Sequence, residues 1–294
     1  MQTSFWGISS RRQTSLSVYH DESGTDVRHD RFLLQGALFV PEANWQYALD
    51  RMTRSRGDYK GQIHFAELRD NSRNKRGDAA WNWINTYFNE LADICPYKCI
   101  IADRTSTRPS ITRYRKPSQL YNYAAKLAVR GGIAWSFKNF DALVLTIYSE
   151  RRTLAADDNF ASYLPREIGG KPNSPSSTKR GAPEVALASQ EVQMIDGDPG
   201  RVAPENKGHC EFIQLTDLLT SAIHQAINAS AQQVIKIDVG KFVAQWIDDT
   251  RRPTWTQSLG LHRHFSVSCF PGPDGGFYDV PLGIENRNQM KLLD

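Results

Sequence analysis

The sequence predicts an α/β protein in which a mixed β-sheet is covered by helices on both faces. Strand-like segments come first and are followed by alternating strand and helix patterns, an order that is typical of a layered α/β domain. Residues 142–148 form an almost unbroken apolar run, as expected of a central strand that is buried on both sides. In residues 78–93, apolar side chains recur at every fourth position from Ala79 to Leu91, so one face of a helix would pack on that sheet.

The expected strands are short and are bounded by turn residues. The apolar run at 16–19 ends in acidic residues and a glycine, and a strong strand pattern resumes at 32–40. The segment 97–102 is rich in Ile and is followed by an Asp, while 185–195 alternates between apolar and polar residues. The predicted strands cover residues 16–19, 32–40, 62–65, 97–102, 142–148 and 185–195, of which 62–65 is a short strand-like segment.

The helices are predicted from apolar residues that recur with helical spacing. One helix begins just after Pro41, and another is weakened where Gly131 and Gly132 interrupt it. The strongest pattern runs from 211 to 228, where most residues are apolar. The predicted helices cover residues 44–54, 78–93, 119–137, 159–168, 211–228 and 239–247.

Gly, Pro and Ser mark the segments that are expected to lack regular structure. Residues 169–182 have the composition of a flexible loop, and many Gly and Pro follow position 254. We therefore expect an N-terminal arm over residues 1–14, an α/β domain over 15–230, and a C-terminal helix with an irregular extension over 231–294. A chain of 294 residues, of which 40% are hydrophobic, can bury a full core for such a domain.

The composition favours a cytoplasmic protein. The four cysteines lack the paired spacing of a zinc site, and we expect them to be reduced thiols. The first fifteen residues lack the apolar stretch of a signal peptide. No apolar run approaches the ~20 residues that span a bilayer, so the prediction is a cytoplasmic chain without a membrane partner.

Two aspartates stand where charge is unusual. Asp21 follows an apolar strand, although strands disfavour Asp, and Asp217 lies inside the most apolar helix. In that helix Gln214, Ser221 and His224 recur with Asp217 at spacings of three and four, so the four residues form one polar stripe. A buried carboxylate needs a metal or a charged partner. The alternatives are a turn-forming Asp21 and a thin polar helix face that meets water.

Two glutamates complete the set of candidate acids. Glu67 follows His64 at a spacing of three, which places both on one face if the segment is helical; alternatively, both are ordinary surface residues. Glu150 follows the central strand and would lie near Asp21 if the two strands are parallel neighbours. Weaker candidates, because turn formation also explains them, are Asp103 and Asp196.

Two segments carry an excess of basic residues. Residues 51–76 contain eight basic and three acidic residues, and residues 104–116 contain five basic and no acidic residues. Clustered Arg and Lys in loops suit contacts with phosphate, although many basic loops bind nothing specific. The predicted nucleic-acid-binding residues are Arg51, Arg54, Arg56, Lys60, Arg73, Arg76, Arg104, Arg108, Arg113, Arg115 and Lys116.

Carboxylates on separate strands and one helix favour metal-assisted phosphoryl transfer. Hard oxygen ligands suit Mg²⁺ or Mn²⁺, and two such ions ~4 Å apart can activate water and stabilise a leaving oxygen. The sequence contains no Walker loop, no GxSxG nucleophile elbow and no dinucleotide-binding GxGxxG motif. It therefore gives no support to the enzyme classes that depend on those motifs.

Three segments together resemble the DUF3800 family, a domain found in bacteria and phages. They read YHDESG at 19–24, IHFAEL at 63–68 and IQLTDLL at 213–219. The family has a strand that ends in DESG, an H-x-x-E-L segment and a late I-Q-L-A-D-L helix, and this chain matches all three in order over residues 15–230. Thr216 stands where Ala is usual.

The resemblance implies an RNase H-like fold with an acidic metal site, and hence a nuclease of mobile-element or anti-phage defence systems. By motif it assigns Asp21, Glu67 and Asp217 to the acidic core. Where the family often has Asp at the end of the central strand, this chain has Ser149 and Glu150, so Glu150 would take that place. The four carboxylates would be catalytic and would hold Mg²⁺ or Mn²⁺.

Three hypotheses follow. The first is a Mg²⁺- or Mn²⁺-dependent nuclease whose basic segments guide the phosphodiester backbone. The second is a non-catalytic subunit that binds nucleic acid or a partner protein in a defence or mobile-element complex, and the third is a hydrolase of a small phosphorylated molecule. The nuclease hypothesis requires the four carboxylates to converge within reach of a shared metal.

Overall fold

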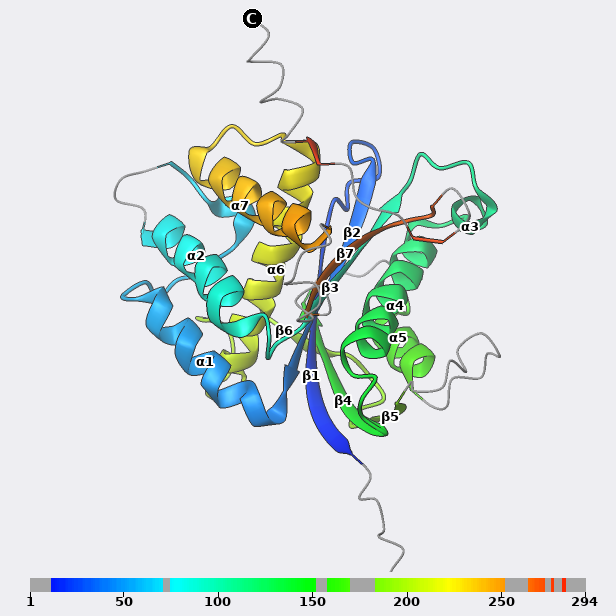
Figure 1. Ribbon diagram of the computed structural model, residues 1–294, viewed down its shortest axis with the longest axis horizontal. Helices are drawn as coiled ribbons and strands as arrows, with labels where there is room; N and C mark the ends of the chain where they lie inside the picture. The colour runs from blue at the N-terminus through cyan, green and yellow to red at the C-terminus, as the bar shows by residue number, and fades with distance from the viewer. Residues whose placement is uncertain are drawn as a thin grey trace, which may run out of the picture.

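The computed structural model describes residues 12–70, 75–151, 158–169, 183–251, 264–272, 276–277 and 282–283. Within this part of the chain, a seven-stranded sheet lies between two layers of helices (Figure 1). The predicted fold class, a mixed α/β sheet with helices on both faces, is confirmed. No helix among the described residues is long and apolar enough to cross a membrane.

The sheet mixes antiparallel and parallel pairs, as the predicted mixed sheet requires. Its order is β5-β4-β1-β2-β3-β7, and β6 pairs with the last residues of β4. The β1–β2 and β2–β3 pairs are antiparallel and the others are parallel, so the C-terminal ends of β1, β3 and β4 lie at the same end of the sheet. The strands are β1 (Gln13–Ser23), β2 (Phe32–Pro41), β3 (Tyr97–Asp103), β4 (Ala142–Glu150), β5 (Glu184–Leu187), β6 (Gln193–Ile195) and β7 (Phe265–Phe270).

The helices divide into two layers. Helices α1, α2, α6 and α7 cover one face of the sheet, and α4 and α5 cover the other (Figure 1). The described helices are α1 (Glu42–Arg56), α2 (Lys75–Thr86), α3 (Pro109–Thr112), α4 (Pro117–Ser136), α5 (Phe160–Ile168), α6 (Lys207–Asn228) and α7 (Val234–Arg251). A π-helical turn, Tyr87–Leu91, continues α2, and two 3₁₀ turns are formed by Phe65–Glu67 and Pro204–Asn206.

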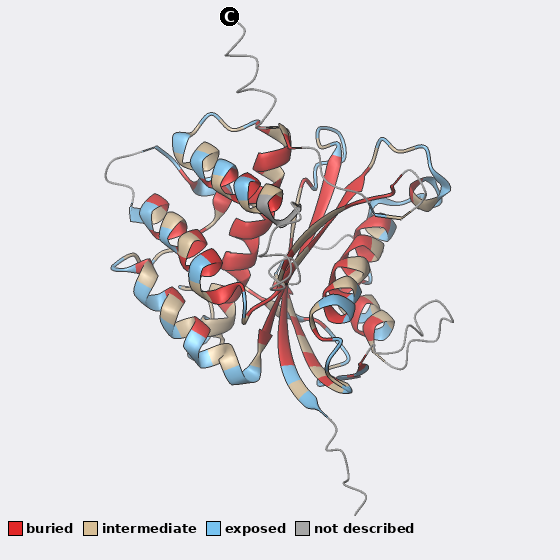
Figure 2. Ribbon diagram, in the orientation of Figure 1, coloured by how far each residue is buried: buried red, intermediate tan, exposed pale blue. Residues whose placement is uncertain are grey.

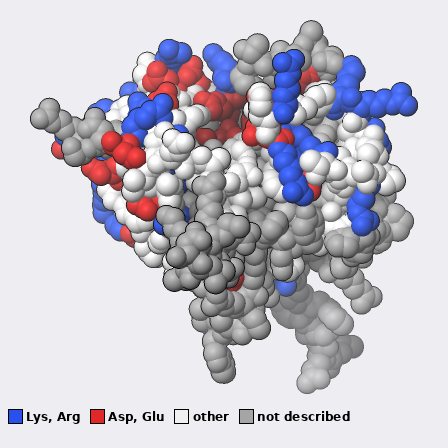
Figure 3. Space-filling model, turned by 90° about the horizontal axis from the view of Figure 1, so that it is seen from above, with Lys and Arg blue, Asp and Glu red and all other residues white. Residues whose placement is uncertain are grey.

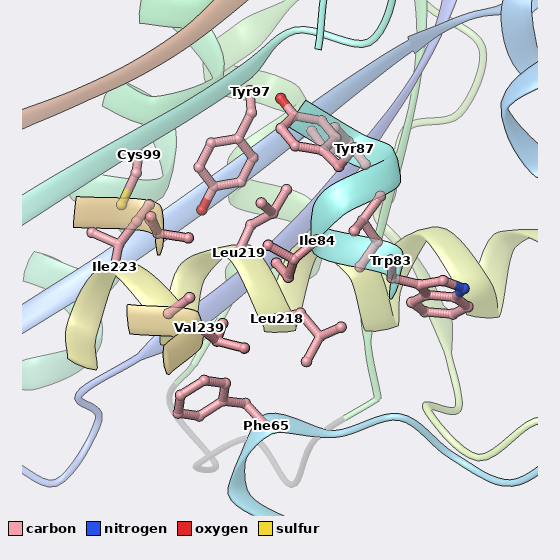
Figure 4. Close-up of a cluster of buried hydrophobic side chains, with 14 of the residues drawn as sticks. Phe65, Trp83, Ile84, Tyr87, Tyr97, Cys99, Leu218, Leu219, Ile223 and Val239 are labelled. Carbon is pink, nitrogen blue, oxygen red and sulfur yellow. The ribbon is translucent and has the colours of Figure 1, made fainter. Parts of the chain in front are cut away.

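Helix α6 lies at the centre of the larger core. Figure 2 shows it buried along most of its length. Its Leu218, Leu219 and Ile223 belong to the same buried cluster as Tyr97 of β3 and Trp83 of α2 (Figure 4). A helix buried on nearly all sides must satisfy any polar side chain within the protein.

Gly36 of β2 allows α6 to come close to the sheet. A Cβ atom at this position would lie 2.1 Å from the Thr220 hydroxyl oxygen and 2.4 Å from the Tyr97 hydroxyl oxygen. Those two hydroxyl groups form a buried hydrogen bond of 2.8 Å. Gly36 is also the pairing partner of Asp21 in β1, so this close approach of α6 to the sheet lies beside the first candidate acid.

Two predicted strands differ from the structure. Residues 62–65 form no strand, because the backbone N–H groups of Ile63 and Phe65 donate to side chains of α6. The predicted strand 185–195 is split into β5 and β6, and between them the Ser189 hydroxyl and the Glu191 backbone form a local turn.

The two chain ends also depart from the prediction. The strand β1 begins at Gln13, inside the expected arm, and residues 1–11 lie outside the described part. The extension expected to be irregular contributes β7, which pairs in parallel with β3. Phe265 and Cys269 of β7 are buried, so this strand both covers the edge of β3 and adds to the core. The predicted loop over 169–182 lies almost wholly outside the described residues.

Candidate functional site

Asp21 and Glu150 are brought together by the parallel pairing of β1 and β4. The register pairs His20 with Ser149, so the next residue of each strand is one of the two acids. Successive side chains of a strand alternate between its faces, and both acids fall on the α6 face. This neighbourhood is the one expected for parallel strands.

Asp217 reaches the same end of the sheet from α6. One of its carboxylate oxygens accepts a 2.8 Å hydrogen bond from the Phe65 backbone N–H, and the other accepts a 3.1 Å bond from the Ser221 hydroxyl. Asp217 and Asp21 are each only 4% exposed. The alternative of a polar helix face that meets water is therefore wrong for Asp217.

The rest of the polar stripe of α6 is also engaged with its surroundings. Gln214 accepts a 2.7 Å bond from the Ile63 N–H and donates to the Gly197 carbonyl at 3.0 Å. His224 shares a 3.0 Å hydrogen bond with the Ser23 hydroxyl at the end of β1. The stripe fixes the segment around residue 64 and the end of β1 against one helix.

The carboxylates lie close enough to influence one another. Burial raises the pKa of Asp21 well above its usual value, and the charges of Asp217, Glu22 and Glu150 raise it further. Burial and the charge of Asp217 raise the pKa of Glu150 to about 7, and burial raises the pKa of Asp217. We call these four residues, Asp21, Glu22, Glu150 and Asp217, the acidic cluster. Like charges gathered in a poorly solvated place disfavour ionisation of each other.

Figure 3 looks onto the end of the molecule where β1 finishes. Acidic side chains gather there in a recessed region, and Lys and Arg side chains stand around it. Among the described residues, no Lys or Arg forms an ion pair with Asp21, Glu150 or Asp217. The positive charge near the acids is thus peripheral to them.

Two residues of this site were not among the predicted catalytic acids. His64 lies with Nε2 3.8 Å from an Asp217 oxygen, and its charged form would lower the pKa of both Asp217 and Glu150. Glu22 accepts a 2.7 Å bond from the Tyr121 hydroxyl, which comes from α4. The sequence contained a signal for both, since Glu22 is adjacent to Asp21 and His64 opens the H-x-x-E-L segment.

Glu67 does not join the acidic cluster. Its carboxylate forms an ion pair with Arg76 of α2, and its side chain is 48% exposed. The 3₁₀ turn that contains it is only three residues long, and His64 before it has an extended backbone. His64 and Glu67 therefore do not share a helical face. The structure brings together three of the four predicted carboxylates and places the fourth outside.

The donor chemistry of the cluster suits a divalent cation, but its present side-chain arrangement is not a finished metal site. A hard cation bound by buried carboxylates would stabilise their charged forms and offset the repulsion between them. Within the described ranges, however, no group of three or more His, Cys, Asp or Glu side chains stands in an arrangement that could hold a metal. Binding would require the carboxylates of Asp21, Glu150 and Asp217 to turn toward one another.

Several of the predicted nucleic-acid-binding residues are occupied within the protein. Arg56 is buried, pairs with Glu211 at 2.7 Å and donates to the Tyr59 carbonyl at 2.9 Å, so its prediction as a phosphate contact is wrong. Arg51 and Arg76 form ion pairs with glutamates, and Arg104 donates to two backbone carbonyls. Arg73 lies outside the described residues. Six are exposed: Arg54, Lys60, Arg108, Arg113, Arg115 and Lys116.

Comparison with known proteins finds distant structural similarity. No protein-family model matches the chain, and no curated protein does. A point mutant of Bst-RNase HIII is similar over 81% of this chain and 56% of that chain, with a TM-score of 0.36 and 10% identity. Bst-RNase HIII in complex with Mn²⁺ is similar over 95% of this chain and 70% of that chain, with the same TM-score and identity. Similarity at this level carries no argument about function.

Proposed function

We propose that the chain is a Mg²⁺- or Mn²⁺-dependent nuclease of the DUF3800 family that hydrolyses phosphodiester bonds. The observation that supports this proposal is the acidic cluster, in which carboxylates from two parallel strands and one buried helix lie close enough to raise one another's pKa values. Repulsion among buried acids is costly and persists mainly where it serves a function. The family resemblance adds a setting in anti-phage defence or mobile elements, with protein partners of that setting.

Three residues of the cluster and several residues around them have distinct parts in this proposal. Asp21, Glu150 and Asp217 would hold the metal, which when bound supplies the positive charge that activates water and neutralises the leaving oxygen. The Phe65 N–H and the Ser221 hydroxyl fix Asp217. His64 is 33% exposed, with Nε2 3.8 Å from an Asp217 oxygen, and its imidazole can donate a hydrogen bond to a phosphate oxygen. Glu67 takes part only if its ion pair with Arg76 opens.

The position of Glu67 also favours a second candidate function. Glu67, the fourth predicted acid, is paired with Arg76, and the carboxylates among the described residues are not arranged around a metal. Both features suit a subunit that binds nucleic acid without cutting it. The exposed basic residues after β3 would serve either function. The two candidates differ in whether the acids are needed for a reaction or only for the fold.

Cleavage assays on a panel of labelled nucleic acids distinguish the two candidate functions. The panel contains single- and double-stranded DNA, RNA, tRNA and an RNA–DNA hybrid, each incubated with Mg²⁺, Mn²⁺ or EDTA. The variants are Asp21→Asn and Asp217→Asn, and Asp103→Asn is the matched control. Asp103 also ends a strand at this end of the sheet, but it pairs with Arg31 at 2.7 Å rather than with the cluster.

The nuclease proposal expects metal-dependent cutting that falls at least about 100-fold in Asp21→Asn and Asp217→Asn and is retained in Asp103→Asn. Circular dichroism verifies that all three variants are folded. Cutting that survives both cluster variants contradicts the proposal. Salt-sensitive binding without cutting, unchanged by the variants, favours the non-catalytic subunit.

A further inference from the structure

The segment that follows β3 stands at the same end of the sheet as the acidic cluster. Because β2 is antiparallel to both β1 and β3, the latter two strands run in the same direction. The chain therefore leaves β3 at the end of the sheet where β1 also ends, and Figure 1 shows α3 at this end, near the top of α4. Arg104 fixes this segment to the β1–β2 hairpin, since its guanidinium donates to the carbonyls of Gly24 at 2.6 Å and Asp30 at 3.0 Å.

The guanidinium of Arg113 in this segment lies over two aromatic rings. Its guanidinium carbon lies 4.8 Å from the centre of the Tyr114 ring and 5.0 Å from that of Tyr123. The Arg113 Nη2 group donates a 2.7 Å hydrogen bond to the Tyr114 hydroxyl. The two rings are 5.0 Å apart, and Tyr123 also contacts Phe270 of β7. The guanidinium thus lies on two tyrosines that pack against the hydrophobic core.

The positive charge of Arg113 is not balanced by a carboxylate. The residue is exposed, and among the described residues no carboxylate pairs with it. The two tyrosines, by contact and hydrogen bonding, raise the pKa of its guanidinium. An arginine that is immobilised without an ion pair retains both its charge and its planar surface for a ligand.

A planar cation of this kind suits a nucleobase. Bases of unpaired strands stack on aromatic side chains and on guanidinium planes, whereas a duplex hides the faces of its bases. Arg108 and Arg115 are exposed in the same segment and can contact phosphates on either side. We propose that Arg113, supported by Tyr114 and Tyr123, is a base-stacking platform that makes this chain select single-stranded nucleic acid. The inference rests on the proposed action on nucleic acid and adds the strandedness of the substrate.

Binding in EDTA tests the platform without cleavage. Fluorescence anisotropy would measure the full chain with a short single-stranded DNA, the RNA of the same sequence, the corresponding duplex, and a strand with abasic sites. Arg113→Lys keeps the charge and removes the plane. Arg130→Lys, the same change at an exposed arginine of α4, is the matched control. Tyr114→Phe keeps the supporting ring and removes the hydrogen bond to the guanidinium.

We expect Arg113→Lys to weaken binding to a single strand about tenfold, the effect of losing one stacked base, and to change duplex binding less than twofold. Arg130→Lys should change every affinity less than twofold. On the strand with abasic sites, Arg113→Lys should bind as tightly as the unsubstituted protein. The platform would be overturned if Arg113→Lys weakened binding to single strand and duplex equally, or weakened neither. It would also be overturned if the unsubstituted protein failed to bind single strands. Selective binding of single strands that is followed by no cleavage in Mg²⁺ or Mn²⁺ refutes the nuclease but leaves the platform standing.

Discussion

The two basic segments have the same excess of five positive charges in the sequence, yet the fold uses them differently. In the first, residues 51–76, three arginines are paired with glutamates, including Arg56 with the distant Glu211. In the second, residues 104–116, Arg104 bonds backbone carbonyls, and Arg108, Arg113 and Arg115 remain exposed. Charge in the first segment is therefore partly structural, because three of its eight basic residues are paired, whereas most of the charge in the second is available to a ligand.

The strongest test of this comparison is the substitution Arg56→Met. It removes a buried guanidinium and leaves Glu211 without its cation, and the Glu211 Oε2 atom already lacks a hydrogen-bond partner within the described structure. Breaking such a pair costs about 3–5 kcal/mol, which urea unfolding would measure as a loss in the free energy of unfolding. Arg54→Met, an exposed position on the same helix, is the control and should change it by less than about 0.5 kcal/mol. Equal effects of the two variants would contradict a structural role for the first segment.

The acidic cluster sharpens the comparison, because among the described residues neither basic segment forms an ion pair with Asp21, Glu150 or Asp217. The pKa of Glu150 is about 7 in the folded protein, above its ordinary value of 4.5. Between these values the folded protein binds more protons than the unfolded chain, so the free energy of unfolding falls as pH rises from about 5 to about 7. We expect this fall to be about 1–2 kcal/mol, since one pKa unit corresponds to about 1.4 kcal/mol and partial exposure of the side chain reduces the effect.

Urea unfolding in EDTA at several pH values would measure this slope, and Glu150→Gln should flatten it. Added Mn²⁺ should then raise the melting temperature of the unsubstituted protein at pH 8 more than that of Glu150→Gln, because a bound cation offsets the repulsion. Glu191→Gln, at an exposed position far from the cluster in the sequence, serves as the control. A slope that persists in Glu150→Gln would assign the pH dependence to other groups.

Local patterns were sufficient to predict most of the fold and the main acids. The apolar run of β4 and the polar stripe of α6 reflect packing that repeats along a single element, and such repeats are visible in the sequence. The proximity of Asp21 and Glu150 could be predicted because both end strands that were expected to be parallel neighbours, whereas Asp217 was joined to them by the family resemblance. The fold class followed from the order of the elements.

What could not be predicted depends on contacts between distant residues or on very short elements. The direction of Glu67 is set by a three-residue turn and by Arg76, and no periodic pattern encodes either. Glu211, the partner of Arg56, lies 155 positions away, so charge counting could not separate a buried arginine from an exposed one. The strand β7 was missed because its alternating residues lie among Gly and Pro, and pairing with β3 stabilises it.

The smallest expected effect compares one arginine from each segment on nucleic-acid binding. Arg115→Ala should lower the salt dependence of binding, the slope of log K against log salt, by about 0.7–0.9, because one phosphate contact is lost. Arg51→Ala should leave that slope unchanged, since its guanidinium is paired with Glu90, and should cost less than about 1 kcal/mol of stability. Anisotropy titrations over a series of salt concentrations measure both slopes. If Arg51→Ala lowers the slope as much as Arg115→Ala, the ion pair with Glu90 opens on binding, and both segments, not the second alone, then belong to the nucleic-acid interface.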